Sequence, residues 1–357
     1  MKKSVFYNSS ITFVRQVFSI MLGLIASMIF ARVLGSNGQG QYTLAILLPT
    51  TLYTMLNLGF PISTIYFIGK KKYSEIEIYS TNLISSVLIS VISIIVGYII
   101  ILFFKEYFFD NLSYKLLLYT LVLLPLIYIQ RNLQTFFQGK EDFEKFNTIV
   151  ILNQLGLLIF SFFFLYIFNL GLFGALISFA GAQFLMLIAS FYLLYKNYNL
   201  FLPKSFSLKY FKESLTFGIK GHLSNVITFL NYRIDLFLIA YFLNDIQVGI
   251  YSIAVLLVER IWIVSQSVST VLFARVTNLS SDTEKNKFTS LAARNTLFIT
   301  FLAGLILVFL SYWIIPLLFG DEFSDSILPF ILMIPGVVIF SMSKILSQDF
   351  TGRGSPE

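Results

Sequence analysis

Charged side chains inside apolar stretches of the chain are the residues best placed to do chemistry. Seven are basic and two are acidic: the cations are Arg15, Arg131, Lys220, Arg233, Arg260, Arg294 and Lys344, and the acids are Asp235 and Glu259. Each charge costs roughly 2.5–3.5 kcal/mol to place in a bilayer, so each is expected to face a water-filled cavity or a partner. Guanidinium groups bind phosphate oxygens in pairs. The excess of cations therefore favours an anionic substrate.

The most polar of these stretches, residues 214–242, carries polar groups on two sides. At 100° per residue, Lys220, Asn231 and Asp235 share one face, whereas His222 and Arg233 lie nearly opposite. Such a helix is expected to lie between a central cavity and its own bundle. The predicted substrate-binding residues are Arg15, Lys220, Asn231, Arg233 and Arg260. The predicted residues for coupling or an ion pair are Asp235, Glu259 and His222.

Several of these assignments have a structural alternative. Asp235 can belong to a structural ion pair, and His222, the only histidine, can simply form a hydrogen bond. Small residues beside Arg15 also fit a packing seam between membrane helices. Arg131 and Lys344 are expected to extend to the lipid headgroups.

The sequence holds none of the residue sets that common catalytic or metal sites require. It has no cysteine and one histidine, which excludes disulfides, thiol catalysis and a histidine-based metal site within the chain. It also lacks a glycine-rich nucleotide loop and a Ser/His/Asp set. We therefore predict neither an enzyme nor a resident metal or cofactor. Nucleic acid is not an expected partner, because the net charge of +7 resides in short loops.

The elements that position these residues are predicted to be membrane-spanning helices. Hydrophobic residues make up 57% of the 357 residues and charged residues only 12%, against about 25% charged in soluble domains. Runs of about 20 apolar residues cross a bilayer, and lipid admits only helices or closed barrels. The predicted fold is an all-α, polytopic membrane protein. Ten spans are predicted, at 9–30, 42–68, 80–104, 114–137, 147–168, 172–195, 214–242, 247–271, 288–318 and 325–348.

Lysine and arginine positions predict the orientation of these spans. With the N-terminus in the cytoplasm, fifteen basic residues fall in inside segments, and three, namely Arg32, Lys105 and Lys115, fall in outside loops. This asymmetry follows the positive-inside rule. The asymmetry also supports the number of spans, because one missed helix would place every later loop on the wrong side and remove the asymmetry.

A repeated phrase divides the chain into two predicted lobes. Residues 31–48 and 240–257 match at a constant offset of 209. Repeated membrane halves enclose a cavity, as in transporters. We therefore predict two pseudo-symmetric helical bundles around a central cationic cavity. The first lobe is residues 1–200, with six helices, and the second is residues 201–357, with four.

A second match supports the repeat and predicts that the chain is truncated. Residues 131–142 resemble residues 344–355, and Gly139 corresponds to Gly352. Two helices follow this segment in the first lobe, whereas the chain ends after the second copy. We expect a chain that holds ten of twelve or more helices. The alternative is that ten helices are complete and the match arose by chance.

Four short motifs follow one another along nearly the whole chain. They are Ala31-Arg32-Val33-Leu34-Gly35 with Gly38, Gly40 and Tyr42; Gln138-Gly139-Lys140 with Phe143 and Asn147; Arg233-Ile234-Asp235 leading into Val248-Gly249-Ile250-Tyr251-Ser252-Ile253-Ala254; and Gly352-Arg353-Gly354. Each motif alone is unspecific. In this order and spacing, the set resembles the polysaccharide (O-antigen) flippases of the multidrug/oligosaccharidyl-lipid/polysaccharide exporter superfamily.

The resemblance implies a transporter that flips an undecaprenyl-diphosphate-linked oligosaccharide, an O-antigen or capsule precursor, to the outer leaflet of a bacterial cytoplasmic membrane by alternating access. It also implies membrane lipids and glycan polymerase machinery as partners. Two alternatives within the superfamily are a flippase for the peptidoglycan lipid precursor and a drug/cation antiporter. The first six predicted helices hold no Asp or Glu, which disfavours the antiporter. A membrane-embedded glycan polymerase would need a large external loop, and the largest, about 104–115, is short.

Overall fold

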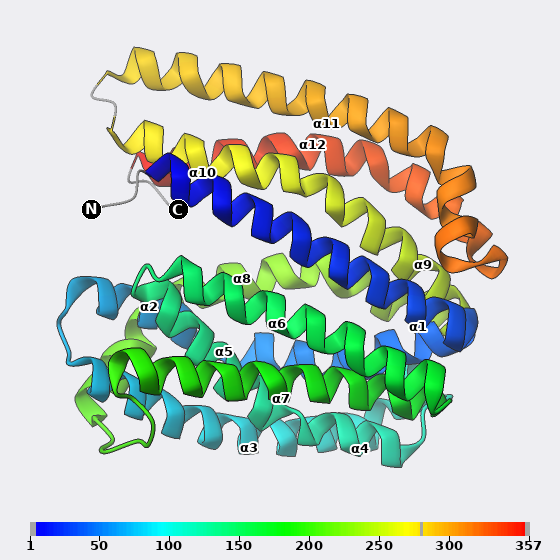
Figure 1. Cartoon of the computed structure of the whole chain (residues 1–357), viewed down its shortest axis with the longest axis horizontal. Helices are drawn as coiled ribbons and strands as arrows, with labels where there is room; N and C mark the ends of the chain where they lie inside the picture. Colours follow the sequence, from blue (N-terminus) through cyan, green and yellow to red (C-terminus); the bar gives the residue numbers. More distant parts are fainter. Residues whose placement is uncertain (1–4, 279–280, 354–357) are drawn as a thin grey trace. The chain divides into compact units, whose positions relative to one another are not determined.

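Helices make up most of the described part of the chain, residues 5–278 and 281–353, in which no strand occurs. This computed structural model confirms the predicted all-α membrane fold. The α-helices are α1 (Val5–Leu56), α2 (Phe60–Lys70), α3 (Glu75–Phe108), α4 (Tyr114–Val122), α5 (Leu124–Gly139), α6 (Phe143–Ser161), α7 (Gly171–Tyr198), α8 (Leu208–Phe242), α9 (Asp245–Val258), α10 (Trp262–Asn278), α11 (Asp282–Phe319) and α12 (Ile327–Gly352) (Figure 1). Short segments of other helix types are η1 (Phe162–Ile167), η2 (Glu259–Ile261) and η3 (Asp321–Ser326). Gly354 of the last sequence motif lies outside the described residues.

Nine helical stretches among the described residues are long and apolar enough to cross a bilayer. The sequence predicts ten, and the difference lies in α1, which joins the first two predicted spans. Gly35 interrupts its helical geometry, with φ 67° and ψ −178°, a conformation that glycine adopts at little steric cost. The rings of Phe30 and Tyr42 stack with centroids 4.6 Å apart, whereas a continuous helix would separate residues twelve apart by about 18 Å. The chain therefore folds back on itself at Gly35.

The predicted span 42–68 is wrong at one point, because the helix ends before Asn57 and α2 begins after Gly59. Leu58 and Gly59 both have positive φ, 54° and 76°. The Asn57 side chain supports this turn by accepting a hydrogen bond from the Gly59 N–H at 2.9 Å. Pro61 lies in the first turn of α2, a position where its missing N–H costs nothing.

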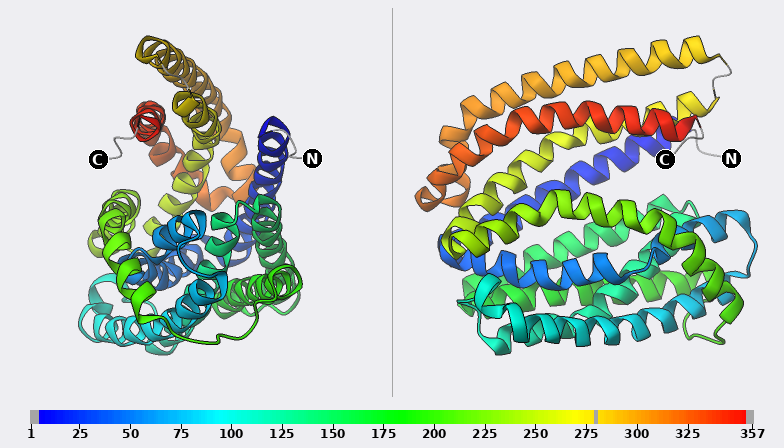
Figure 2. Two further views of the ribbon diagram at one scale, coloured as in Figure 1. Left: turned by 90° about the vertical axis from the view of Figure 1, so that its left-hand side faces the viewer. Right: turned by 180° about the vertical axis from the view of Figure 1, so that it is seen from behind.

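Contacts divide the chain into two compact units, Met1–Val248 and Gly249–Glu357. In the first unit, α6 packs against α1 and α7, α5 packs against α2 and α3, and α8 packs against α2 and α3. In the second unit, α10, α11 and α12 pack against one another. Within each unit the long helices run side by side (Figures 1 and 2). The predicted lobe boundary near residue 200 concerns the sequence repeat, and it stays a prediction.

Buried polar side chains tie α3 to three neighbouring helices of the first unit. Asn82 Nδ2 donates to Thr64 Oγ1 of α2 at 2.7 Å, and Asn82 Oδ1 accepts from the Tyr210 hydroxyl of α8 at 3.2 Å. The hydroxyls of Ser93 and Tyr128 of α5 lie 2.9 Å apart. Such pairing is needed because lipid offers no hydrogen-bond partner.

One face of α8 is held against the turn that precedes α2. In the first half of α8, the buried residues recur every fourth position, at Tyr210, Ser214, Gly218 and His222. The two backbones approach so closely that a Cβ added to Gly218 would lie 2.6 Å from the Gly59 carbonyl oxygen. Real Cβ atoms do not come that close to backbone, so only glycine fits here. This contact fixes α8 against α2 and turns its opposite face outward from the unit.

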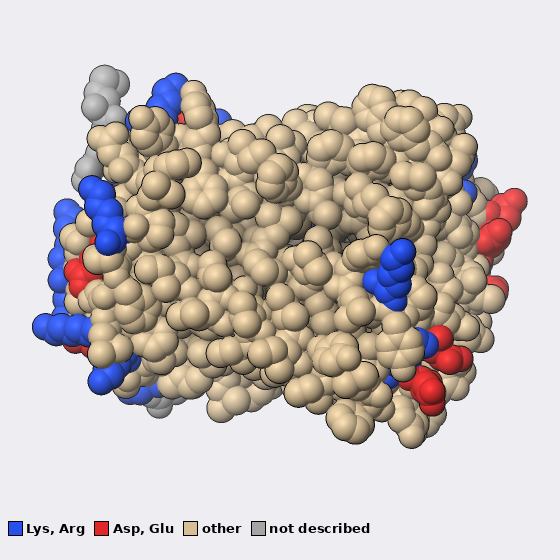
Figure 3. All heavy atoms as spheres, turned by 90° about the horizontal axis from the view of Figure 1, so that it is seen from below, with Lys and Arg blue, Asp and Glu red and all other residues tan. Residues whose placement is uncertain are grey.

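Charged side chains gather at the ends of the helices. On the face drawn in Figure 3, basic side chains lie mostly at one end and acidic ones at the other, and the band between them is almost free of charge. In the second unit, η3 carries three acids and no Lys or Arg. In the first unit, three consecutive lysines, Lys70 to Lys72, instead lie at the end of α2 and the start of the α2–α3 connection. This distribution suits a bilayer around the band, since a charge within lipid is costly.

The glycine contact generates a stability prediction. Gly218→Ala should destabilise the protein by about 1–3 kcal/mol, because overpacking forces the α8 and α2 backbones apart. Gly69→Ala in α2 is the matched control: its added Cβ meets no atom within 4 Å, so the substitution should be neutral or stabilise by up to about 1 kcal/mol. Thermal unfolding in detergent, followed by circular dichroism, measures both. Equal unfolding temperatures for the two variants would contradict the close contact.

Candidate functional site

α8 carries five of the eight predicted site residues, and these five differ in how far they are buried. Lys220 and Asn231 are exposed on the surface of the first unit. His222 is only 5% exposed, and its Nε2 donates to the Met55 carbonyl oxygen at 3.0 Å. Its Nδ1 has no hydrogen-bond partner among the described residues. His222 thus forms the hydrogen bond that the sequence analysis gives as the alternative to a coupling role. A role of His222 in coupling stays a prediction.

Arg233 and Asp235 lie in the last third of α8 and are half-buried. Arg233 Nη1 donates to the Tyr232 carbonyl oxygen at 3.2 Å. Asp235 Oδ1 accepts from the Leu236 N–H at 2.8 Å. Because the two charged residues are two positions apart, they do not face each other across the helix surface. The C-terminal part of α8 therefore carries a cation and an anion that point in different directions.

Glu259 and Arg260 lie in the second unit, where the turn η2 separates α9 from α10. The Arg260 Nε is buried and has no hydrogen-bond partner in the described part of the chain. Nearby, Lys344 of α12 lies over the indole ring of Trp262, with Nζ 3.9 Å from the ring centroid. The Lys344 ammonium group thus makes a cation–π contact, and its extension to the headgroups stays a prediction.

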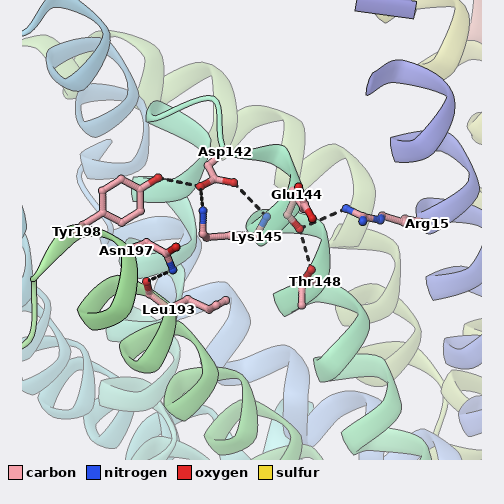
Figure 4. A network of polar contacts seen from close by, with 8 residues as sticks. All are labelled: Arg15, Asp142, Glu144, Lys145, Thr148, Leu193, Asn197 and Tyr198. Carbon is pink, nitrogen blue, oxygen red and sulfur yellow. Dashed lines mark hydrogen bonds and ion pairs between the residues drawn. The ribbon is translucent and has the colours of Figure 1, made fainter. Parts of the chain in front are cut away.

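Arg15 lies in a different place, beside the first turn of α6. Its Nη1 donates to the Glu144 carbonyl oxygen at 3.4 Å (Figure 4). Next to it, Asp142 caps α6 by accepting from the Lys145 N–H at 3.3 Å, and it also accepts from the Tyr198 hydroxyl at 2.8 Å. Burial alone would raise the pKa of the Asp142 carboxyl, but these bonds and the Lys145 ammonium hold it below its usual range. The network ties the α5–α6 turn to the end of α7.

An open pocket of about 730 Å³, lined by residues of α2 and α8, brings Lys220 together with three further lysines that entered the sequence argument only through the predicted orientation. We call it the lysine pocket. It is lined by Tyr66, Phe67, Lys70, Lys72, Lys212, Glu213, Thr216, Phe217 and Lys220. Lys212, Thr216 and Lys220 recur every fourth residue, so they share one face of α8. That spacing is the sequence signal that could have identified this wall of the pocket.

Aromatic rings and one ion pair shape the lysine pocket. The Lys72 Nζ lies 2.5 Å from Glu213 Oε2, which joins the segment after α2 to α8. The rings of Tyr66 and Phe217 stack with centroids 4.0 Å apart. The Lys70 ammonium lies 5.9 Å from the centroid of the Tyr66 ring. The pocket therefore has an apolar wall with ammonium groups around it.

The lysine pocket carries an excess of positive charge. Four lysines line it, together with one carboxylate, Glu213, and that carboxylate is already paired with Lys72. In the described part of the chain, no ion pair involves Lys70, Lys212 or Lys220. Four ammonium groups and one carboxylate leave three positive charges uncompensated. Such a site can bind an anion with more than one negative charge.

The five predicted substrate-binding residues therefore lie in three places. Lys220, Asn231 and Arg233 are on α8, Arg15 is beside α6, and Arg260 is in the second unit. Of these, Lys220 lines the lysine pocket. Within residues 5–278 and 281–353, no group of three or more His, Asp and Glu side chains could hold a metal ion.

Comparisons with known proteins identify the fold and the family. The sequence model of a family described as "Polysaccharide biosynthesis protein" matches residues 5–280. No curated protein sequence matches the chain. The solved structure "Lipid II flippase MurJ, inward closed conformation" is similar to this chain with a TM-score of 0.77 at 19% identity, over 97% of this chain and 77% of that chain.

Two further solved structures are each described as a multidrug resistance MATE family transporter of the MOP superfamily. The one in the inward-facing conformation gives a TM-score of 0.69 at 15% identity, over 97% of this chain and 85% of that chain. The one in the outward-facing conformation gives a TM-score of 0.61 at 15% identity, over 97% of this chain and 82% of that chain. At these identities the likeness establishes a shared fold.

Proposed function

Because the chain belongs to the polysaccharide biosynthesis protein family, we propose that it is a flippase that moves a lipid-linked oligosaccharide across a membrane. The family match covers residues 5–280, and it confirms the resemblance inferred from the sequence motifs. The proposed cargo is an undecaprenyl-diphosphate-linked oligosaccharide such as an O-antigen or capsule precursor. The proposed route leads from the cytoplasmic to the outer leaflet, and we propose no catalytic step for the chain.

The observation that carries this proposal is the lysine excess at the exposed face of α8. A diphosphate ester carries about two negative charges, and it needs compensating cations wherever it leaves water. Lys220 and its neighbours supply uncompensated ammonium groups beside an apolar wall. Arg233 adds a guanidinium group farther along the same helix, and guanidinium groups bind phosphate oxygens in pairs. A cation-exporting protein would be expected to have the opposite charge balance.

The sequence repeat supports alternating access as the proposed mechanism. In the proposal, lobes 1–200 and 201–357 face each other across a central cationic cavity and rock to open it to either side. The diphosphate would be held by Arg15, Lys220, Asn231, Arg233 and Arg260. Asp235, Glu259 and His222 are the proposed coupling groups. The lipid tail would stay in the bilayer throughout, and a glycan polymerase would use the delivered precursor.

A second candidate cargo is the peptidoglycan lipid precursor. The likeness to the lipid II flippase MurJ favours it, with a TM-score of 0.77. Both candidate cargoes are lipid-linked sugars, so the cationic α8 suits either of them. A drug/cation antiporter has the support of the MATE likeness, with TM-scores of 0.69 and 0.61. The cationic excess in the lysine pocket weighs against that reading.

The proposed location is a bacterial cytoplasmic membrane with the N-terminus in the cytoplasm. Reporter fusions test the orientation: a fluorescent protein fused after Lys71 or Asp282 should fluoresce, and alkaline phosphatase fused after Asp110 should be active. These outcomes follow from the positive-inside rule. Phosphatase activity from a fusion after Lys71 would overturn the orientation.

Substitutions on α8 test the proposed substrate role. Arg233→Ala and Lys220→Ala should each reduce surface glycan by about tenfold or more in a flippase-deficient host, since each removes a cation from the substrate path. Arg294→Ala is the control, because Arg294 is exposed near the start of α11 and belongs to neither proposed set. Surface glycan is measured at matched membrane levels of each variant. Normal glycan with both α8 variants would remove these residues from the substrate path.

A further inference from the structure

We propose that the lysine pocket is a loading site that binds the diphosphate headgroup of a polyprenyl-diphosphate-linked substrate at the membrane surface, before transport. This inference rests on the proposed function and adds a distinct binding step to it. Lys70 and Lys212, which belong to neither proposed substrate nor coupling set, are assigned to this step together with Lys72 and Lys220.

The charge of the pocket selects the ligand. Lys70, at the end of α2, and Lys212 and Lys220, in the first half of α8, line one pocket, and no ion pair involves any of the three in the described part of the chain. Lysines that only orient a helix in the membrane need not converge on one cavity; these lysines do. A phospholipid phosphodiester carries about one negative charge and a diphosphate ester about two. An excess of three therefore suits the diphosphate better, although both ligands share the phosphate chemistry that lysine recognises.

The position of the pocket suits a ligand that is anchored in the bilayer. Lys70 is the last residue of α2 and Lys72 follows the helix, so these ammonium groups lie where the apolar span gives way to the charged end. Anionic headgroups collect at such basic ends of membrane proteins. The stacked Tyr66 and Phe217 rings form the apolar wall, and an apolar wall strengthens the attraction of nearby charges. A lipid headgroup can therefore reach the pocket while its tail stays in the bilayer.

In this proposal, the Glu213 carboxylate competes with the ligand phosphate for Lys72. Glu213 Oε2 lies 2.5 Å from Lys72 Nζ, so an incoming phosphate must displace it to bind that ammonium group. Removing the carboxylate should therefore strengthen binding, whereas removing lysines should weaken it. Opposite effects from two substitutions in one cavity are not expected from damage to the fold, which would weaken binding in both cases.

Binding to the purified full chain in phosphatidylcholine nanodiscs tests the site, with undecaprenyl diphosphate as the probe. Lys70→Gln/Lys212→Gln should weaken binding by about tenfold, and Glu213→Gln should strengthen it by about threefold, as expected for opposite changes of charge in one pocket. Lys71→Gln is the matched control: Lys71 lies between Lys70 and Lys72 and is exposed, but it does not line the pocket. It should change the affinity by less than about twofold, because a screened surface charge outside the site contributes little.

Two further arms distinguish the sources of phosphate. Titration with phosphatidylglycerol should give weaker binding that responds less to the double lysine substitution. Equal sensitivity of both lipids would assign the pocket to a phospholipid and overturn the proposal. Unchanged affinity of Lys70→Gln/Lys212→Gln for undecaprenyl diphosphate would also overturn it. Inorganic pyrophosphate should compete with the lipid probe in the wild-type chain, and failure to compete would contradict recognition of the diphosphate.

The same variants separate this inference from the proposed function. If the wild-type chain restores surface glycan in a flippase-deficient host and Lys70→Gln/Lys212→Gln restores it equally well, the loading site fails while the proposed function stands. If the wild-type chain restores no glycan of any kind but binds undecaprenyl diphosphate through these lysines, the transport proposal fails while the site stands.

Discussion

The close approach of two glycine backbones is the contact on which the arrangement of the first unit depends. Gly59 and Gly218 lie so near each other that neither tolerates a Cβ without movement of the backbone. Their contact holds one face of α8 against the turn before α2, and the hydrogen bond from His222 to Met55 lies one helical turn farther along the same face. Because that face is buried, the polar residues on the other side, including Lys220, are turned outward. The lysine pocket is a consequence of this placement.

Lipid as the surrounding solvent explains where polar groups occur. Serine and threonine hydroxyls within the helices bond to carbonyl oxygens of the preceding turn, as Ser86 and Ser178 do, so they add little polar surface. Asn82 instead joins three helices through two hydrogen bonds. Charges concentrate at the helix ends, where water and headgroups compensate them. The lysines beside α8 belong to these charged ends, and what sets Lys70, Lys72, Lys212 and Lys220 apart is that they line one pocket.

Long apolar runs made the helical fold and most spans predictable, because nothing else in a protein is apolar for 20 residues. The break between α1 and α2 was not predictable from hydropathy, since Leu58 and Gly59 continue the apolar run. The signals for it are local instead: Asn57, Gly59 and Pro61 are residue types that favour a turn and a new helix start. The family could be recognised from four short motifs. Each motif alone is unspecific, but their order and spacing along the chain together resemble the family. The reversal at Gly35 falls between the predicted spans 9–30 and 42–68, but hydropathy gave no reason to expect helix on both sides of Gly35 within that connection.

The candidate site was only partly predictable, because its walls come from distant segments. Lys220 was identified as a charge inside an apolar stretch, but Lys72 and Glu213 are 141 positions apart and meet only in the folded chain. Arg15 was grouped with the α8 residues by its charge, whereas its guanidinium donates to the first turn of α6.

We propose that these cations serve the passage of a diphosphate-linked lipid, and a proteoliposome assay with a fluorescent undecaprenyl-diphosphate-linked oligosaccharide tests this passage. The protein should move the label between leaflets, and pyrophosphate should inhibit the movement. If the label binds but moves only at the rate of protein-free liposomes, these cations do not serve transport.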